Sequence, residues 1–183
     1  NEVWVANTGV ISVRNKHTLK ELKHFNEENG LPEDVISAMH FTEDSTLFIG
    51  TEHKGIYRYV SETNSFKEIL LSGDDLSLTI TSLTSRENQL WIGTLNGVYK
   101  MNVKTEGIVS YNVSSGLSHN SVGDILITKT GDIFIGTRSA FLNKFNDGIF
   151  EKIRLTPEYD IVTANKLIES SDGAIWISTS DNG

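Results

Sequence analysis

The sequence offers few residues whose types and spacing would suit catalysis or metal binding. Its 183 residues include five histidines and no cysteine, which excludes disulfides, thiolate metal sites and cysteine nucleophiles. The histidines show no close pairing that would form a local metal site, although a fold could bring distant ones together. The carboxylate pairs at 27–28 and 74–75 are adjacent in sequence and typical of solvated turns. We therefore expect no catalytic residue, metal or cofactor in this chain.

A different set of side chains has the chemistry of sugar recognition. Planar polar groups hydrogen-bond hydroxyls, and an aromatic ring can cover the apolar face of a sugar. The candidates for ligand contact are Glu33, Asp34, His53, Asp74, Asp75, His119, Asn120, Arg138 and Tyr159. The alternative is that these residues only shape turns, because surface loops are polar in most folds. Whether these residues contact a ligand or only shape turns depends on the strands and turns that position them.

One nonapeptide, QLWIGTLNG at residues 89–97, recurs along the chain at a nearly constant interval. Related segments are LFIGTEHKG at 47–55, IFIGTRSA at 133–140, IWISTSDNG at 175–183 and the less similar VWVANTG at 3–9. Their leading aromatic residues are separated by 44, 43, 43 and 42 positions. A catalytic constellation usually appears once, whereas a packing unit must be copied to bury its faces. The nonapeptide is therefore structural.

Each period fits four short antiparallel strands, because apolar and polar residues alternate with period two. In the copy around Trp91 we predict strands over 80–85, 89–94, 97–103 and 107–113. Residues 18–30 could instead form a short helix, but the repeat favours a strand there. Four antiparallel strands in 42–44 residues are typical of one propeller blade. The expected fold class is all-β, a β-propeller of four-stranded antiparallel blades with about four repeats. The expected division is 1–34 (incomplete), 35–78, 79–120, 121–162 and 163–183 (incomplete).

The repeated aromatic and glycine residues have a packing explanation. A Trp or Phe on the second strand should fill the space between neighbouring blades, and burying each is worth about 2 to 3 kcal/mol. A glycine two positions later leaves room where the backbone approaches another sheet. The residues assigned to this structural motif are Trp4, Phe48, Gly50, Trp91, Gly93, Phe134, Gly136 and Trp176.

Both ends of the chain fall inside a repeat, at second strands near 2–7 and 175–180. A four-bladed ring could close by pairing the terminal strands, but it would then hold one second strand too many. We expect instead a fragment of a larger propeller, of about six to eight blades. Aromatic residues without a covering neighbour drive association. Self-association or dimerisation through the blade ends is therefore expected.

Hairpin alternation sorts the turns onto two faces of the expected fold. The turns between second and third strands share one face with the links between blades, which we call the link face. The segments on the link face are 30–35, 52–54, 73–78, 95–96, 116–122, 138–139 and 156–162. All nine candidate residues for ligand contact fall on these segments.

Composition limits the partners. The formal net charge is −8 and the pI is near 5.1, which disfavours nucleic acid and anionic membranes because phosphate contacts need clustered Lys and Arg. No apolar run approaches the roughly 18 to 20 residues needed to cross a bilayer. We expect this segment to bind neither nucleic acid nor membrane.

Three segments together resemble a known family of repeats. They are WIGT at 91–94, GVYK at 97–100 and the link GLSHNSV at 116–122. They are similar to the two-component regulator propeller repeat, and the resemblance covers essentially the whole chain. Ser178 and Ala140 replace glycines of the pattern, so those blades are expected to be less regular. WD and kelch repeats fit less well, since the chain has no Trp-Asp dipeptide closing a repeat and no Gly-Gly pair.

The resemblance implies the periplasmic or extracytoplasmic sensor part of a membrane-anchored histidine kinase or hybrid kinase and response regulator. It implies an oligosaccharide ligand and the remainder of the sensor kinase chain as partners. These residues contain no kinase motif, so the chain itself is not expected to be an enzyme. Two alternatives stay open: a protein-interaction scaffold without a small ligand, and a carbohydrate-active enzyme with two opposed carboxylates about 5 to 10 Å apart.

Overall fold

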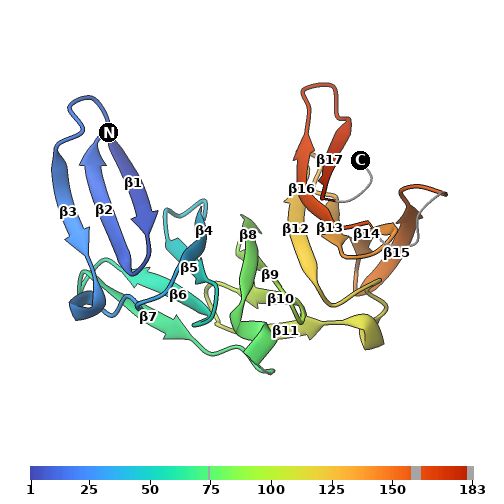
Figure 1. The fold of residues 1–183 in the computed structure, drawn as a ribbon, viewed down its shortest axis with the longest axis horizontal. Helices are drawn as coiled ribbons and strands as arrows, with labels where there is room; N and C mark the ends of the chain where they lie inside the picture. The colour runs from blue at the N-terminus through green and yellow to red at the C-terminus, as the bar shows by residue number, and fades with distance from the viewer. Residues whose placement is uncertain (74, 158–161, 181–183) are drawn as a thin grey trace.

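The computed structural model describes residues 1–73, 75–157 and 162–180, whose strands form antiparallel sheets that follow one another along the chain (Figure 1). The first sheet contains β1 (Glu2–Asn7), β2 (Val10–Asn15) and β3 (Glu21–Phe25). The second contains β4 (Ile36–Phe41), β5 (Leu47–Thr51), β6 (Ile56–Val60) and β7 (Ser65–Ile69). The third contains β8 (Ile80–Arg86), β9 (Gln89–Thr94), β10 (Gly97–Asn102) and β11 (Ile108–Tyr111). The fourth contains β12 (Val122–Ile127), β13 (Ile133–Thr137), β14 (Phe141–Asn146) and β15 (Ile149–Arg154), and the fifth contains β16 (Ala164–Glu169) and β17 (Ile175–Thr179).

The sheets form a curved row, with the first sheet (blue) and the fifth (red) at its two ends (Figure 1). The first strands of successive four-stranded sheets and of the fifth, β4, β8, β12 and β16, are neighbours in space. Short 3-10 helices lie in the links: η1 (Glu27–Asn29), η2 (Asp75–Leu78) and η3 (Val113–Ser115). This arrangement confirms the all-β class and the four-stranded antiparallel sheets expected of a propeller. In the ambiguous segment 18–30, the strand interpretation is confirmed by β3, which η1 follows.

Aromatic side chains on the second strands pack against the following sheet, as predicted. Trp91 on β9 is buried, and its ring centroid lies 4.8 Å from that of Phe145 in the fourth sheet, in an edge-on contact. Phe48 and Phe134 are buried at the same position of their own sheets. Trp4, half-buried, meets Phe41 of the second sheet at a centroid distance of 5.7 Å. These rings therefore form the contacts between successive sheets.

Trp176 differs from the other second-strand rings, and its predicted place between two sheets stays a prediction. Its side chain is exposed, because no sheet follows β17 in the described part of the chain. The indole lines an open apolar hollow with Ile168 and Lys166. Ser178 lies beside it, at the position where other copies of the repeat have glycine.

The repeated glycines lie where the next sheet approaches most closely, which confirms their predicted role. A methyl group at Gly93 would lie 2.9 Å from Cγ1 of Val122, on the first strand of the next sheet. A methyl group at Gly136 would lie 2.8 Å from Cβ of Ala164. Gly50 approaches the side chain of Ile80, the first residue of β8, in the same way. Glycine at these positions therefore sets the spacing between sheets.

A buried carboxylate joins the first strands of three sheets. Asp124 on β12 accepts hydrogen bonds from Ser82 Oγ on β8 at 2.7 Å and from the backbone N–H of Leu167 on β16 at 2.9 Å. Lys166 Nζ lies 3.1 Å from the same carboxylate. The charge of Asp124 is thus paired and hydrogen-bonded, as a buried charge must be. This network fixes the order and register of the first strands.

Candidate functional site

The links between sheets and the turns between second and third strands lie together, as hairpin alternation predicts. In the link from the third to the fourth sheet, the carbonyl of Asn120 accepts a hydrogen bond from Gly97 N at 2.7 Å. The next carbonyl, of Ser121, accepts one from Arg138 N at 3.0 Å. This link is thus held by the turn before it and the turn after it. The link and its two turns form one hydrogen-bonded surface and not a set of separate loops.

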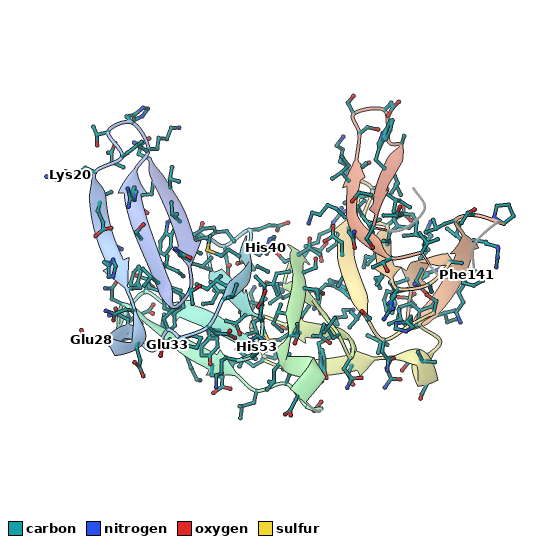
Figure 2. The ribbon with its side chains drawn as sticks, in the orientation of Figure 1. Lys20, Glu28, Glu33, His40, His53 and Phe141 are labelled. Carbon is teal, nitrogen blue, oxygen red and sulfur yellow. The ribbon has the colours of Figure 1, made fainter. Side chains whose placement is uncertain are left out.

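Glu33 and His53 lie on the lower side of the molecule in Figure 2, whereas Lys20, next to the turn between β2 and β3, lies near the upper side. Glu33 is exposed and helps to line an open hollow together with Glu27 and Glu28 of η1. Together with η1, this edge of the link face is acidic. A neutral polar or cationic ligand suits it better than an anion.

Asp34 and His53 form a pair that bridges a link and a turn. The Asp34 carboxylate is buried and accepts hydrogen bonds from the backbone N–H groups of His53 at 2.6 Å and Val35 at 2.8 Å. It also lies 3.1 Å from His53 Nδ1. Burial by itself would raise the pKa of Asp34, but the hydrogen bonds from His53 and Val35 outweigh that effect and hold the pKa below its ordinary value.

The imidazole of His53 is well placed to meet a ligand. Its side chain is 72% exposed, although Nδ1 faces the Asp34 carboxylate. Because an ionised carboxylate only accepts hydrogen bonds, Nδ1 carries the proton and donates it, which leaves Nε2 directed away from the pair. Asp34 therefore orients a solvent-facing imidazole without using its second nitrogen.

Asn120 and His119 serve mainly to build the link itself. Asn120 Oδ1 accepts a hydrogen bond from Val113 N at 2.9 Å, and Asn120 Nδ2 donates to Asn96 Oδ1 at 3.3 Å. His119 Nδ1 accepts from Ser121 N at 2.9 Å. Both side chains remain partly accessible. The structure therefore brings Asp34 and His53 together, while Asn120 pairs with a turn residue outside the candidate set.

The other candidates are more scattered. Arg138 is exposed in the turn between β13 and β14, and its backbone bridges to Thr163 at the start of the fifth sheet. Asp75 is exposed at the start of η2. Asp74 and Tyr159 lie outside the described residues.

A buried polar cluster on the link face was not found from the sequence. Asn143, on β14, is fully buried and binds Ser118 twice, accepting from its N–H at 2.9 Å and donating to its Oγ at 2.7 Å. The Ser118 hydroxyl also contacts the hydroxyls of Thr137 at 2.8 Å and Ser139 at 2.8 Å. One sequence feature could have indicated this cluster. Asn143 is polar although the alternation of β14 places it at an inward-facing position.

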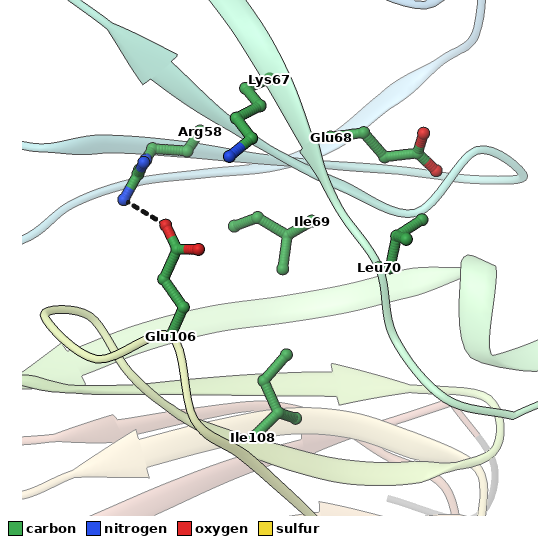
Figure 3. Close-up of a pocket in the computed structure, with 7 residues that line it drawn as sticks. All are labelled: Arg58, Lys67, Glu68, Ile69, Leu70, Glu106 and Ile108. Atoms are coloured by element: carbon green, nitrogen blue, oxygen red, sulfur yellow. Dashed lines mark ion pairs between the residues drawn. The ribbon is translucent and has the colours of Figure 1, made fainter.

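A hollow on the outer side of the molecule contains none of the candidate residues. It lies between the second and third sheets and has a volume of about 260 Å³ (Figure 3). Ile69, Leu70 and Ile108 supply its apolar wall, and an ion pair of 2.9 Å between Arg58 and Glu106 crosses one side of it. It lies between outer strands and not on the link face. Among the described residues no group of three or more metal-ligating side chains occurs.

Comparison with solved structures finds a similar fold in the extracellular domains of two sensor systems. The chain is similar to the extracellular domain of the putative one component system BT4673 from B. thetaiotaomicron, with a TM-score of 0.80, 20% identity and 97% of this chain covered. It is similar to the extracellular domain of the putative hybrid two component system BT3049 from B. thetaiotaomicron, with a TM-score of 0.75, 22% identity and 97% of this chain covered. The chain spans 25% and 24% of those two chains. These are proteins of the kind that the sequence resemblance indicates.

The same fold also occurs in an enzyme. Virginiamycin B lyase from Staphylococcus aureus matches 97% of this chain and 59% of its own, with a TM-score of 0.77 and 14% identity. No family model matches the sequence, and no curated protein matches it. The described residues contain no helix long and apolar enough to cross a membrane.

Proposed function

We propose that this chain is part of the extracytoplasmic sensor module of a two-component system, of the hybrid histidine kinase and response regulator type. The observation that carries the proposal is the match of 97% of the chain to extracellular domains whose names describe such systems. In this proposal the chain lies in the periplasm, in a membrane-anchored protein, and its partner is the rest of the sensor kinase. The module itself is non-enzymatic.

The sheets are then successive blades of a larger propeller, with the division given above from the repeat. Within residues 1–73, 75–157 and 162–180, the first and fifth sheets have three and two strands, whereas those between them have four. A blade of the same repeat needs all four strands to bury both of its faces.

The proposed ligand is an oligosaccharide derived from a polysaccharide, bound on the link face. His53 presents one free ring nitrogen, and Glu33 adds an exposed carboxylate from the adjoining link. Arg138 offers an exposed guanidinium farther along the link face, in the fourth sheet. Sugars are neutral and rich in hydroxyls, so they match polar groups on a rigid scaffold without needing a strongly charged pocket. Asp34 acts by orienting His53, and Asn120 by shaping the link.

The test is a thermal-shift and calorimetric screen of the chain against oligosaccharides. A ligand at 100 times its Kd stabilises the folded state by about 2.7 kcal/mol, a clear rise in Tm. The variant His53→Ala removes the imidazole but keeps the backbone N–H that Asp34 binds. The matched control is His17→Ala, since His17 is an exposed histidine in the turn between β2 and β3.

We expect binding that His53→Ala weakens at least tenfold and His17→Ala leaves unchanged. Equal effects of the two variants would argue against the link face. No binding by an intact ectodomain, across a broad panel of glycans, would argue against sugar sensing.

A further inference from the structure

A hollow between the third and fourth sheets carries an unbalanced positive charge. It has a volume of about 320 Å³ and is lined in part by the turns between first and second strands, which lie on the opposite side from the link face. Arg86 and Lys100 of the third sheet supply two cations, and Ile127 and Ile133 of the fourth sheet supply apolar surface. Among the described residues that line it, Glu87 alone is acidic. Both sheets have four strands and a neighbour on each side, so the hollow does not depend on an uncovered end sheet.

The repeat shows what is unusual about Lys100. Each four-stranded sheet has a cation on its third strand, directly opposite the aromatic ring of the second strand: Arg58 opposite Phe48, Lys100 opposite Trp91 and Lys144 opposite Phe134. Glu106 lies 2.9 Å from Arg58 and neutralises it. Asp132 lies 2.8 Å from Lys144 and does the same. Within residues 1–73, 75–157 and 162–180, Lys100 has no carboxylate partner, and its Nζ lies 5.5 Å from the ring centroid of Trp91. Lys100 therefore lacks the counter-charge that its two equivalents have.

Neutral groups hold the second cation of the hollow, Arg86. Its Nη1 donates to the backbone carbonyls of Thr128 at 3.2 Å and Lys129 at 3.4 Å, which belong to the following sheet. Gly131 leaves room for the guanidinium, because a methyl group there would lie 2.7 Å from Nη1. These contacts fix the position of the guanidinium, but carbonyls do not balance its charge. The N–H groups on Nε and Nη2 remain for an anion.

A sugar unit with an anionic group matches this hollow in charge, polarity and size. Such a group accepts paired hydrogen bonds from a guanidinium and is attracted to an ammonium. The amide of Gln89, at the start of β9, can bind hydroxyls. Ile127 and Ile133 present apolar surface to the C–H groups of a sugar ring. The volume of about 320 Å³ is at the lower end of the range of ligand sites, which is about 300 to 1,000 Å³.

We propose that this hollow is a second ligand site, which takes a sugar unit that carries a carboxylate or a sulfate ester. The anionic group lies between Arg86 and Lys100 and supplies the counter-charge that the chain does not. The sugar ring rests on the fourth sheet, so that one bound unit contacts two sheets. This site is separate from the link face, because its lining residues lie on strands and on the opposite turns.

The experiment is calorimetric titration of the chain with charged and uncharged sugars of the same backbone. One pair of probes is trigalacturonate and its methyl ester, in which the carboxylates are uncharged. The other pair is a trisaccharide with sulfate esters and the same trisaccharide without them. A second readout is the emission of Trp91 in the variant Trp4→Phe with Trp176→Phe, since Lys100 lies over that ring.

The variants change one charge at a time. Lys100→Met keeps an unbranched side chain over Trp91, and Lys100→Arg keeps the charge. Arg86→Gln removes the guanidinium. The matched control is Lys67→Met, since Lys67 is an exposed lysine on the outer strand β7. His53→Ala serves as a control for binding on the link face. Circular dichroism and Tm values of all variants establish that they fold.

We expect at least one charged probe to bind, and its uncharged form to bind about tenfold more weakly or less. Lys100→Met and Arg86→Gln should each weaken the charged probe by about tenfold or more, whereas Lys100→Arg, Lys67→Met and His53→Ala should change its Kd by no more than about twofold. Binding should shift the emission of Trp91 and should weaken at high salt. Binding of only one charged probe supports the site and identifies the anionic group that it takes.

Three results would overturn the proposal. The first is that neither charged probe binds. The second is that an uncharged form binds as tightly as its charged counterpart, because the two cations would then contribute nothing. The third is that Lys67→Met or His53→Ala weakens binding as much as Lys100→Met does, which would place the anion elsewhere on the protein.

Discussion

The substitution Gly93→Ala tests whether glycine sets the spacing between the third and fourth sheets. The added methyl group would lie 2.9 Å from Val122 Cγ1 and 3.0 Å from Thr81 Oγ1. Both distances are too short for an ordinary contact, so the sheets must shift or side chains must leave their preferred rotamers. Overpacking of this kind costs about 1–3 kcal/mol. For a chain of this length the cost corresponds to a fall in Tm of about 2–12 °C.

The matched control is Gly107→Ala, in the turn before β11. The backbone of Gly107 is not in the left-handed region, and an added methyl group would have only Thr105 Oγ1 nearby, at 3.5 Å. Alanine at a site of this kind is neutral or stabilises by about 0.4–1 kcal/mol through the unfolded chain. Thermal and urea unfolding of the two variants provides the comparison.

A second substitution identifies the atom responsible. Val122→Ala removes Cγ1, the nearest atom to the added methyl, so Gly93→Ala should cost less in that background than in the wild type. Non-additivity of about 0.5 kcal/mol or more is expected for residues in contact. Some cost should remain because Thr81 is untouched. If Gly93→Ala proves as harmless as Gly107→Ala, the inferred close approach of the sheets is wrong.

The buried aromatic and titratable groups give further predictions. Trp91→Ala should destabilise the fold by about 3–5 kcal/mol, and Trp176→Ala by no more than about 0.5 kcal/mol. Urea unfolding at low protein concentration measures both values. Similar losses of stability in the two variants would contradict the finding that Trp91 is buried and Trp176 is exposed. Asp34→Asn should cost about 1–3 kcal/mol at pH 7. Because the folded-state pKa of Asp34 lies below its ordinary value of 3.8, its contribution is complete well above that pH and lost as the pH falls through the folded pKa, so variant and wild type should converge in acid. Burial lowers the pKa of His40 from 6.5, so its contribution to stability is present above pH 6.5 and is lost as the pH falls through the folded-state pKa. His40→Gln should therefore reduce the loss of stability between pH 7 and 5. An unchanged dependence of the free energy of unfolding on pH would count against this.

The fold was largely predictable because its signals are local and repeated. The interval between Phe48, Trp91 and Phe134 fixes the repeat, and period-two alternation fixes the strands within it. The strand predicted over 89–94 has those bounds in the structure, because a turn at each end stops it. The exposure of the Trp176 side chain could not be predicted in the same way. Burial of a second-strand ring depends on a following sheet and not on the sequence around the ring.

For the candidate site, the sequence predicts which face of the fold carries it but not which side chains come into contact. Hairpin alternation places the links and turns together, but it does not say which side chains will meet. The contact between Asp34 and His53 joins residues 19 positions apart, and no local pattern specifies it. The cluster around Ser118 and Asn143 was missed because its hydroxyl and amide groups are ordinary in a loop and become notable only when buried.

Aromatic rings about 43 residues apart are held between successive sheets. Fluorescence quenching by acrylamide on two single-tryptophan variants is the most direct test of this packing. Trp4→Phe with Trp176→Phe leaves Trp91, and Trp4→Phe with Trp91→Phe leaves Trp176. At low protein concentration, Trp91 should emit at short wavelength and resist quenching, whereas Trp176 should emit at long wavelength and be readily quenched. Equal access of acrylamide to the two indoles in folded protein would show that Trp91 is not held between two sheets.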